Sequence, residues 1–303
     1  MIEYISVIIP SLNPDIPRLN RTLEGLKNQT FSLDKWELII VDNNSTAPIQ
    51  VNLSWHPNTK VVAEPKPGLT YARVKGFLEA KGDIVILVDD DNILDENYLQ
   101  NTIEIFKNHL TLGTIGGKSI PLFENPPPVW IKGFWNSLAL RDLGDKVIIE
   151  KWEEKYPKAA PIGAGMAIRK ESLQTYIEKV LSKKNIITDR KGSSLSSGGD
   201  NDIVIEILKS GWQTGYFPSL IIQHIIPKER IQVKYLARLI NNSNKSWVQL
   251  LESHNINPWQ KIPEWTVTLR KVKAWFVYKA WFNKVNYIKW RGACGTFEGL
   301  SKN

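Results

Sequence analysis

Short apolar runs rich in β-branched residues alternate with helical patterns along the first hundred residues of the chain. Residues 84–88 are apolar at every position, which is typical of a strand buried on both faces. Strands joined by helices and short connections predict a parallel sheet with right-handed crossovers, so the expected fold class is α/β. The predicted strands are 4–10, 36–41, 61–63 and 83–88, and the predicted helices between them are 19–29 and 71–81.

The pattern continues less regularly up to about residue 230. Residues 121–161 hold three consecutive prolines and several aromatic residues, and they predict an insertion of loops and short helices. Residues 183–199 are rich in Gly and Ser and predict a loop. The remaining expected elements are helices at 96–108, from 171 and at 201–209, and strands at 114–120, 162–169 and 214–224. We therefore expect one α/β domain over residues 1–230, with a helical C-terminal extension over 231–303.

Composition and charge exclude several classes of protein. Apolar residues make up 42% of the chain and charged residues 23%, which excludes a disordered, collagen-like or coiled-coil chain. The net charge is +8, but residues 261–303 alone hold nine basic and two acidic residues, so this tail carries +7 and the first 260 residues carry +1. A nearly neutral body with a basic tail is a poor match to a uniformly basic nucleic-acid binder, and no nucleic-acid partner is predicted.

The basic tail is also rich in aromatic residues. Eight aromatic side chains lie between residues 265 and 290, interleaved with lysines and arginines. This combination suits a membrane surface, where rings lie at the depth of the lipid headgroups and basic residues meet anionic lipid. It equally suits an amphipathic helix that packs its rings on the catalytic body. Composition leaves both interpretations open.

The cellular location follows from cysteine content and from the N-terminus. Cys294 is the single cysteine and has no internal disulfide partner, which favours a reducing compartment. The first residues show no signal-peptide pattern, and the longest apolar runs are far shorter than the ~18 to 20 residues that a membrane span needs. We expect a cytoplasmic protein whose membrane contact, where it has one, is peripheral on the inner face.

Polar residues follow each strand of the predicted parallel sheet. Ligands of such sheets bind beyond the carboxyl ends of the strands, so these residues are expected to face one crevice. Three consecutive carboxylates are part of this set, and adjacent unpaired carboxylates repel each other unless a cation lies among them. Hard oxygen ligands favour Mg²⁺ or Mn²⁺. The residues at the strand ends are Ser11, Asn13, Asp42, Glu64, Asp89, Asp90 and Asp91.

Alternation along an extended backbone separates the roles of the three carboxylates. Asp89 and Asp91 point the same way and can act on one ligand, while Asp90 points the opposite way and supports the backbone. The alternative is an acidic turn in which Asp91 or Asn92 caps the next helix.

Four motifs along this part of the chain resemble the successive signatures of family 2 glycosyltransferases. They are SVIIPSLN at 6–13, IVDNNS at 40–45, PGLTYAR at 67–73 and VDDD at 88–91. The resemblance covers residues 3–230, in the order and spacing of the family. It implies the GT-A fold, a nucleotide-binding α/β sandwich, and an inverting enzyme that uses a nucleotide-diphosphate sugar.

The resemblance also assigns roles to individual residues. Asp42 would accept a hydrogen bond from the base, Asp89 would contact the ribose, and Asp91 would bind the metal that bridges the diphosphate. His224, at the end of the last strand, would approach the metal or the diphosphate. Residues 1–120 would form the nucleotide-sugar-binding half and 121–230 the acceptor-side half. The residues assigned to the nucleotide-sugar are Pro10, Ser11, Asn13, Asp42, Arg73, Asp89, Asp90 and Gly165.

The catalytic base of the family is an aspartate that precedes a helix. Counting back eleven residues from Gly211 places this base on Asp200. Gly199 then stands where the family usually has glutamate, and Asp202 is the nearest carboxylate to take over part of that residue's role. As an alternative, Asp200 and Asp202 are acidic residues in a first helical turn, where the helix dipole favours negative charge. The segment 189–195, just upstream, resembles a loop that closes over the donor, although a connection without function is an equal alternative.

The sequence therefore predicts a metal-assisted glycosyltransferase with Asp200 as general base. Its expected partners are a nucleotide-diphosphate sugar and a glycan or lipid-linked acceptor, in cell-surface polysaccharide biosynthesis. The alternative is a non-catalytic nucleotide- or carbohydrate-binding protein of the same fold, which the departure at Gly199 keeps open. A nucleotidyltransferase is disfavoured, because residues 11–14 lack a Gly-rich phosphate loop after the first strand.

Overall fold

The computed structural model describes residues 3–182 and 198–301. These residues form two compact units. The first unit contains residues 3–122, 139–182 and 200–225, and the second contains 123–138, 198–199 and 226–301. Residues 123–138 thus belong to the second unit, although the sequence alone groups them with the α/β domain.

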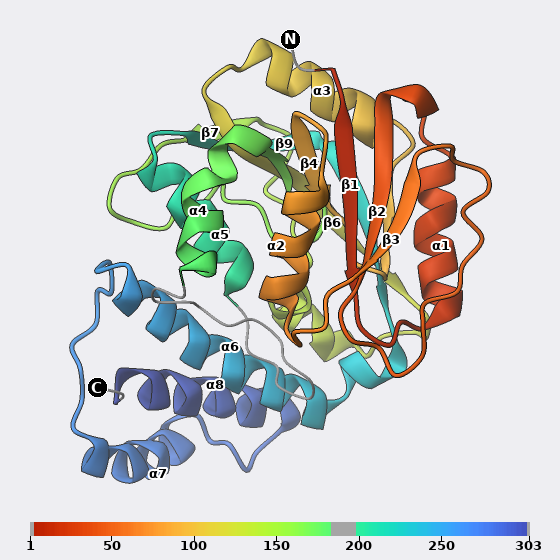
Figure 1. Cartoon of the computed structure of the whole chain (residues 1–303). Helices are drawn as coiled ribbons and strands as arrows, with labels where there is room; N and C mark the ends of the chain where they lie inside the picture. The colour runs from red at the N-terminus through yellow and green to blue at the C-terminus, as the bar shows by residue number, and fades with distance from the viewer. Residues whose placement is uncertain (1–2, 183–197, 302–303) are drawn as a thin grey trace. The chain divides into compact units, whose positions relative to one another are not determined.

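The first unit is built on one mixed sheet (Figure 1). Its strand order is β3-β2-β1-β4-β8-β6-β9-β5, and β7 pairs with β9. The prediction of an α/β fold is confirmed, with parallel pairing through β3, β2, β1 and β4 and antiparallel pairing from β4 to β8 onward. The strands are β1 (Ile5–Ser11), β2 (Trp36–Asp42), β3 (Thr59–Ala63), β4 (Ile84–Leu87), β5 (Asn92–Leu94), β6 (Leu112–Phe123), β7 (Ile148–Glu150), β8 (Ala167–Arg169) and β9 (Gln213–Ile226).

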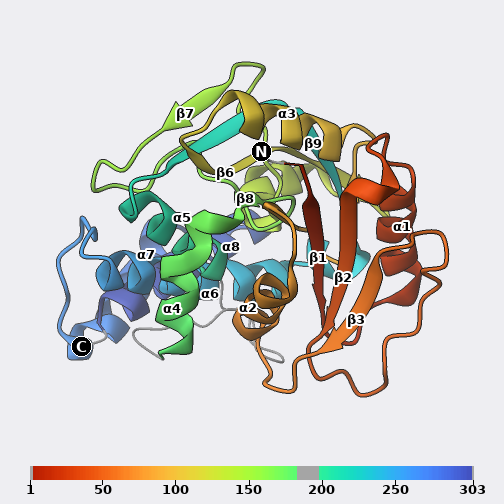
Figure 2. The ribbon, with the colours of Figure 1, turned by 45° about the horizontal axis from the view of Figure 1, so that its top comes forward.

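Helices cover both faces of the parallel part of the sheet (Figure 2). Alternate residues of β1 show how: Val7 packs in the core with α1 and α3, whereas Ile8 packs in the core with α2, α4 and α5. Both faces of β1 are therefore buried, as the continuous apolar pattern indicates. The helices are α1 (Ile16–Lys27), α2 (Leu69–Glu79), α3 (Tyr98–Asn108), α4 (Gln174–Leu181) and α5 (Gly199–Lys209).

The parallel register aligns the carboxyl ends of the first strands. Ser11 lies opposite Asp42 in the pairing of β1 with β2, and Asp42 lies opposite Ala63 in the pairing of β2 with β3. Polar residues that follow these strands therefore start from one edge of the sheet, as predicted.

The structure corrects the predicted strands in the second half. β5 and β7 are missing from the prediction because each is only three residues long, too short for a periodic pattern. The strand predicted at 162–169 is reduced to Ala167–Arg169. Gly165 has φ +73°, a left-handed conformation that interrupts an extended strand.

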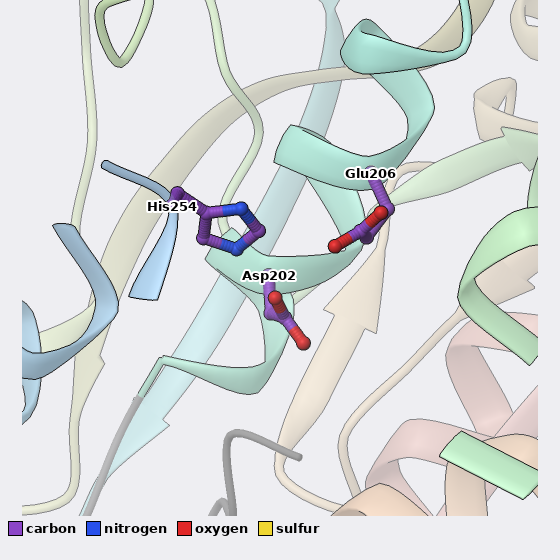
Figure 3. A group of neighbouring side chains, drawn as sticks. All are labelled: Asp202, Glu206 and His254. Carbon is purple, nitrogen blue, oxygen red and sulfur yellow. The ribbon is translucent and has the colours of Figure 1, made fainter. Parts of the chain in front are cut away.

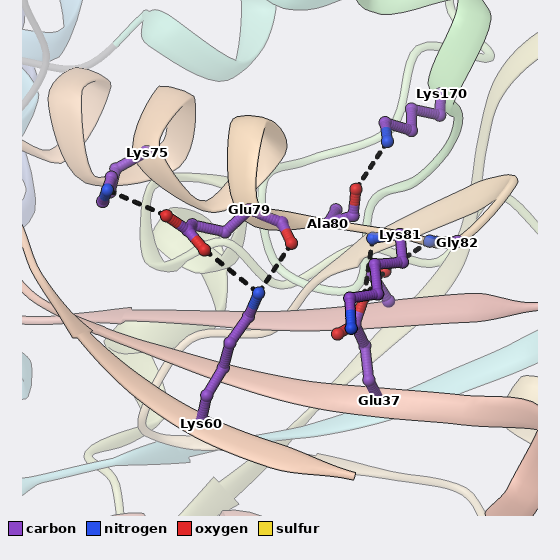
Figure 4. A network of polar contacts seen from close by, with 9 residues as sticks. Glu37, Lys60, Lys75, Glu79, Ala80, Lys81, Gly82 and Lys170 are labelled. Atoms are coloured by element: carbon purple, nitrogen blue, oxygen red, sulfur yellow. Dashed lines mark hydrogen bonds and ion pairs between the residues drawn. The ribbon is translucent and has the colours of Figure 1, made fainter.

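A network of hydrogen bonds holds together the amino ends of the parallel strands (Figure 4). The buried Glu37 carboxylate accepts hydrogen bonds from Ser6 Oγ at 2.7 Å and from the Lys81 backbone N–H at 2.6 Å. Lys60 and Lys75 both donate to Glu79 at the end of α2, at 3.1 and 2.9 Å. The network ties α2 to the first residues of β1, β2 and β3, which holds the strands in register for the edge at their other end.

The second unit is helical, as predicted for the C-terminal extension. Its elements are the 3₁₀ segments η2 (Val129–Leu138), η4 (Lys228–Ile231) and η5 (Glu264–Thr266) and the helices α6 (Val233–Ser253), α7 (Val267–Val277) and α8 (Lys284–Leu300). No helix within the described residues is long and apolar enough to cross a membrane.

Three glycines of α8 allow it to pack directly on α6. A Cβ at Gly295 would lie 1.9 Å from the Asn241 carbonyl oxygen, and a Cβ at Gly299 would lie 2.7 Å from Val248 Cβ. Gly292 lies one turn before Gly295, and its carbonyl accepts a hydrogen bond from Asn244 Nδ2 at 3.1 Å. The two helix backbones approach closely because these positions carry no side chain.

We expect Gly295→Ala to lower the free energy of unfolding by about 2 kcal/mol, because the added methyl group meets backbone rather than a movable side chain. The control is Gly133→Ala, where a Cβ would have no neighbour within 4 Å. Chemical denaturation of both variants measures the difference. Equal stability of the two variants would contradict the close packing of α6 and α8.

His56 makes stability depend on pH. Its ring packs edge-on against Trp36, with ring centroids 4.0 Å apart, and burial lowers the His56 pKa from 6.5 to about 4. Between these two values the unfolded chain binds the proton and the folded chain does not, so the free energy of unfolding falls as pH decreases from 6.5 toward about 4. We expect His56→Phe, measured by denaturation at several pH values, to lose less stability than the wild type over this window. Parallel pH profiles of the two proteins would exclude His56 as the source.

Candidate active site

The ends of β1 and β4 are joined by a direct side-chain contact. Ser11, the last residue of β1, donates a hydrogen bond from Oγ to the Asp90 carboxylate. Pro10 precedes it in the strand, opposite Val41 of β2. The structure thus places Asp90 in contact with the neighbouring strand. Residues 90–91 form a turn rather than an extended segment, with the Asn92 N–H donating to the Asp89 carbonyl at 3.1 Å, so the predicted alternation of the three carboxylates is wrong.

Asn13 and Asp42 organise the turn that follows β2. Asn13 is left-handed, with φ 48°, and its Oδ1 accepts a hydrogen bond from the Thr46 backbone N–H at 2.8 Å. Its own N–H donates to Ser45 Oγ at 2.9 Å, and Asp42 Oδ1 accepts from the Ser45 N–H at 2.9 Å. Asn13, which follows β1, and Asp42, the last residue of β2, therefore bind the same turn.

Asn43 is a buried residue whose structural role the sequence prediction missed. Its Nδ2 donates to the carbonyl oxygens of Glu64 and Lys66 at 3.1 and 2.8 Å, and its Oδ1 accepts from the Gly68 N–H at 2.8 Å. These bonds hold the loop between β3 and α2 against the end of β2. Its place beside Asp42 in the IVDNNS motif is the signal that could have identified it.

Asp91 and His224 lie side by side and are both buried. Antiparallel pairing of β5 with β9 sets Asn92 opposite His224, and the distance from Asp91 Oδ1 to His224 Nε2 is 3.5 Å. The exposed fractions of Asp91 and His224 are 6% and 4%. A carboxylate oxygen is a ligand for Mg²⁺ or Mn²⁺, and of these two ions Mn²⁺ more readily accepts an imidazole nitrogen, so this pair fits the predicted metal site best with Mn²⁺.

Asn92 supports this pair from within the chain. Its Nδ2 donates to Asp91 Oδ1 at 3.2 Å, and its Oδ1 accepts from the Asp89 backbone N–H at 3.2 Å. Asn92 begins β5, so the three carboxylates at 89–91, which we call the acidic run, connect β4 directly to the next strand. The alternative, that Asp91 or Asn92 caps a helix, is wrong: α3 begins only at Tyr98 and follows Asn97.

Gly165 is bound to the end of β4. Its N–H donates to the Leu87 carbonyl at 2.9 Å, and its own carbonyl accepts a hydrogen bond from the Tyr98 hydroxyl. Burial raises the pKa of Tyr98, which keeps this hydroxyl protonated and able to donate. Leu87 is two residues before Asp89, so Gly165 lies next to the start of the acidic run.

Asp200 and Arg73 meet at Gly163. Asp200 Oδ2 accepts a hydrogen bond from the Gly163 N–H at 2.9 Å. A Cβ at residue 163 would lie 2.7 Å from Arg73 Nη2 and 3.3 Å from Asp200 Oδ2. Glycine at this position therefore lets the buried guanidinium of Arg73 and the carboxylate approach the same point of the backbone.

The segment 163–165 connects the two groups of carboxylates. Gly163 binds Asp200 at the N-terminal end of α5, and Gly165 binds the end of β4 just before Asp89. Asp200 and the acidic run are thus brought to opposite ends of a three-residue segment, although more than a hundred residues separate them in sequence. The segment thus links the surroundings of Asp200 to the end of β4.

Tyr156 is a neighbour of this site that sequence reasoning missed. Its hydroxyl donates to Asn201 Oδ1, and its pKa is raised by burial and by the negative charge of Asp200. No local motif marks it, because it lies in the irregular insertion and reaches α5 only in three dimensions.

Asp202 is bound in a buried ion pair and does not replace the missing glutamate. Lys179 Nζ lies 2.6 Å from Asp202 Oδ1 and 2.8 Å from Glu206 Oε1. Asp202 and Glu206 are one turn apart on α5 (Figure 3), and Asp202 is 1% exposed. Their charge is used to hold α4 against α5. The segment 189–195, predicted as a closing loop, lies outside the described residues.

Comparisons with known proteins agree with this architecture. The model of the family "Glycosyl transferase family 2" matches residues 6–176. A probable glycosyltransferase of Sulfolobus acidocaldarius is 25% identical over 57% of this chain. The poly(ribitol-phosphate) beta-N-acetylglucosaminyltransferase TarP of Staphylococcus aureus is 27% identical over 40% of this chain. The chain is also similar over 98% of its length to the crystal structure of residues 1–349 of S. aureus TarS in complex with UDP, with a TM-score of 0.54 and 14% identity.

These similarities differ in how much of each protein they cover. The alignments span 38% of the Sulfolobus relative and 41% of TarP, whereas the similarity to TarS spans 90% of that chain. At 14% identity the TarS comparison concerns the fold, and it confirms the predicted GT-A architecture.

Proposed function

The chain belongs to glycosyl transferase family 2, and we propose that it is an inverting enzyme that transfers a sugar from a UDP-sugar to a hydroxyl group of a cell-surface glycopolymer. The observation that carries this proposal is the segment 163–165, which brings Asp200 to the acidic run. The UDP complex of TarS supports a uridine nucleotide, and the polymer in the name of TarP supports a polymeric acceptor.

The nucleotide would lie along the carboxyl edge of β1, β2 and β4. Asp42 is half-buried on the turn that Asn13 stabilises, a position suited to accepting a hydrogen bond from the base. Asp89 would contact the ribose, while Ser11 and Asp90, bound to each other, would form the floor of the pocket with Pro10. Each of these roles is part of the proposal.

The diphosphate is the leaving group, and negative charge grows on it as the glycosidic bond breaks. Asp91 and His224 would hold a divalent cation, which when bound supplies positive charge to the diphosphate. Arg73 adds a fixed positive charge beside Gly163, in a buried environment where charge interactions are stronger than in water.

Asp200 would act as the general base. Its Oδ2 accepts from Gly163 N–H at 2.9 Å and its Oδ1 accepts from Asn201 N–H at 3.0 Å, so backbone bonds fix the direction of the carboxylate. As the acceptor oxygen attacks the anomeric carbon, its proton passes to Asp200 and the bond to the diphosphate oxygen breaks on the opposite side.

We expect Asp200→Asn to lower the rate of UDP release from the preferred UDP-sugar, with glycopolymer as acceptor, by about a thousandfold, because the amide cannot take the proton. UDP affinity, measured by calorimetry, should change less than twofold. The control is Asp145→Asn, whose side chain is 92% exposed. An equal loss of UDP affinity and rate would contradict the role of base. Absence of UDP release by the wild type across a panel of UDP-sugars would instead support a non-catalytic binding protein.

Asp91→Asn and His224→Gln test the cation site. We expect each variant to bind UDP at least tenfold more weakly than the wild type when Mn²⁺ is present, because one ligand of the cation is lost. Without Mn²⁺, the affinities of wild type and variants should be similar. Calorimetry with and without Mn²⁺ separates the two cases, and an undiminished effect of Mn²⁺ in both variants would place the cation elsewhere.

A further inference from the structure

Helix α7 and the segment before it turn a row of large apolar side chains outward. Trp265, Leu269, Val272 and Phe276 are spaced by four, three and four residues, which places them on one face. Their exposed fractions are 75%, 62%, 53% and 62%. A row of this kind is unusual on a water-exposed helix and marks an interaction surface.

The opposite side of α7 already has its partner. Ala274 is 6% exposed, and the rings of Trp275 and Trp290 meet edge-to-face with centroids 4.8 Å apart. Trp290 Nε1, on α8, donates to the Lys271 carbonyl at 2.9 Å. Packing on α8 therefore uses one face of α7 and leaves the row at 265, 269, 272 and 276 on the other.

The apolar surface continues into the turn after α7. Trp281 is 57% exposed and Phe282 is 75% exposed, and the ring of Trp281 lies 5.7 Å from that of Phe276. Val277, which directly follows Phe276 in the sequence, is 69% exposed. We call the four residues of the row, together with Val277, Trp281 and Phe282, the aromatic face.

Basic residues predominate in the sequence around the aromatic face, although the exposed Glu264 immediately precedes Trp265. Residues 265–297 contain seven basic residues and no acidic residue. Lys271 is bound to Glu298 at 2.8 Å, but Arg270, Lys273 and Lys279 are exposed. A surface that binds the aromatic face therefore needs an apolar layer into which the rings can insert, together with negative charge.

We propose that the aromatic face docks on the surface of an anionic phospholipid bilayer. Trp and Phe side chains insert at the depth of the headgroups, and the exposed lysines and arginine meet lipid phosphates. The eleven-residue helix α7 lies in the plane of the interface, since no described helix is long and apolar enough to span the bilayer. A second copy of the chain is disfavoured as occupant, because a self-complementary contact would oppose the same positive charges.

Co-sedimentation of the full chain with vesicles tests the proposal. We expect the chain to bind vesicles of phosphatidylcholine with 30% phosphatidylglycerol, and to bind vesicles of pure phosphatidylcholine at least tenfold more weakly. High salt should weaken binding to the anionic vesicles, because it screens the charges. Lack of binding to the anionic vesicles would overturn the proposal.

The double variant Phe276→Ser and Phe282→Ser identifies the surface involved. We expect it to bind the anionic vesicles at least tenfold more weakly, while a control that changes Leu110 and Val129 to Ser, both highly exposed apolar residues elsewhere, binds as the wild type does. Circular dichroism and UDP affinity check that both variants fold. Equal vesicle binding by the two variants would overturn the proposal. Dimers of the wild type that form with rising concentration, and that only the Phe276 and Phe282 variant abolishes, would also overturn it, because they would show that the face binds a second copy of the chain.

Discussion

The hydrogen bond from the Gly163 N–H to the Asp200 carboxylate is the interaction on which the candidate active site depends. It requires that residue 163 has no side chain, because a methyl group there would contact the Arg73 guanidinium and crowd Asp200. Two residues later, Gly165 binds the end of β4 in a left-handed conformation that other residues rarely adopt. Two glycines thus bring a carboxylate at the N-terminal end of α5 to a sheet edge formed by the first ninety residues. Without them the acidic groups would belong to separate parts of the fold.

The two ends of the parallel strands perform different tasks. At the amino ends, buried Glu37 accepts hydrogen bonds from Ser6 and the Lys81 N–H, and two lysines pair with Glu79, so these contacts help to fix the register of the strands. At the carboxyl ends, Asp42 and Asp91 are held by backbone and amide donors that orient them at the sheet edge. The pairing of β5 with β9 then adds His224 beside Asp91. A rigid frame at one end therefore allows charged groups to be concentrated at the other.

Sequence patterns predicted the first half of this site and missed links in the second for physical reasons. Parallel strands with connecting helices have a strong local signature, which predicted that the ends of these strands meet at one edge of the sheet, as the pairing of Ser11 with Asp42 shows. Asp91 and His224 were both placed near the metal by the family resemblance, but periodicity could not predict their contact, because it depends on a three-residue strand with no periodic signature. Asp202 was misjudged because its partner Lys179 lies 23 residues upstream on another helix, and no pattern along the chain relates the two. Gly163 was predicted only as part of a strand over 162–169, and its contact with Asp200 appears only in three dimensions.

The C-terminal extension shows why composition alone left two interpretations open. Aromatic and basic residues are mixed along the sequence, and helix α7 divides its apolar residues between two faces. Trp275 and Ala274 pack inward on α8, whereas Phe276 and Leu269 point outward. An isolated eleven-residue helix is marginal in water, so α7 needs its contact with α8 in order to be helical at all. The glycine contacts between α8 and α6 provide the support behind it. Packing of one face of α7 on α8 is therefore a condition for an ordered apolar row on the other face, which is the face that we propose to meet a membrane.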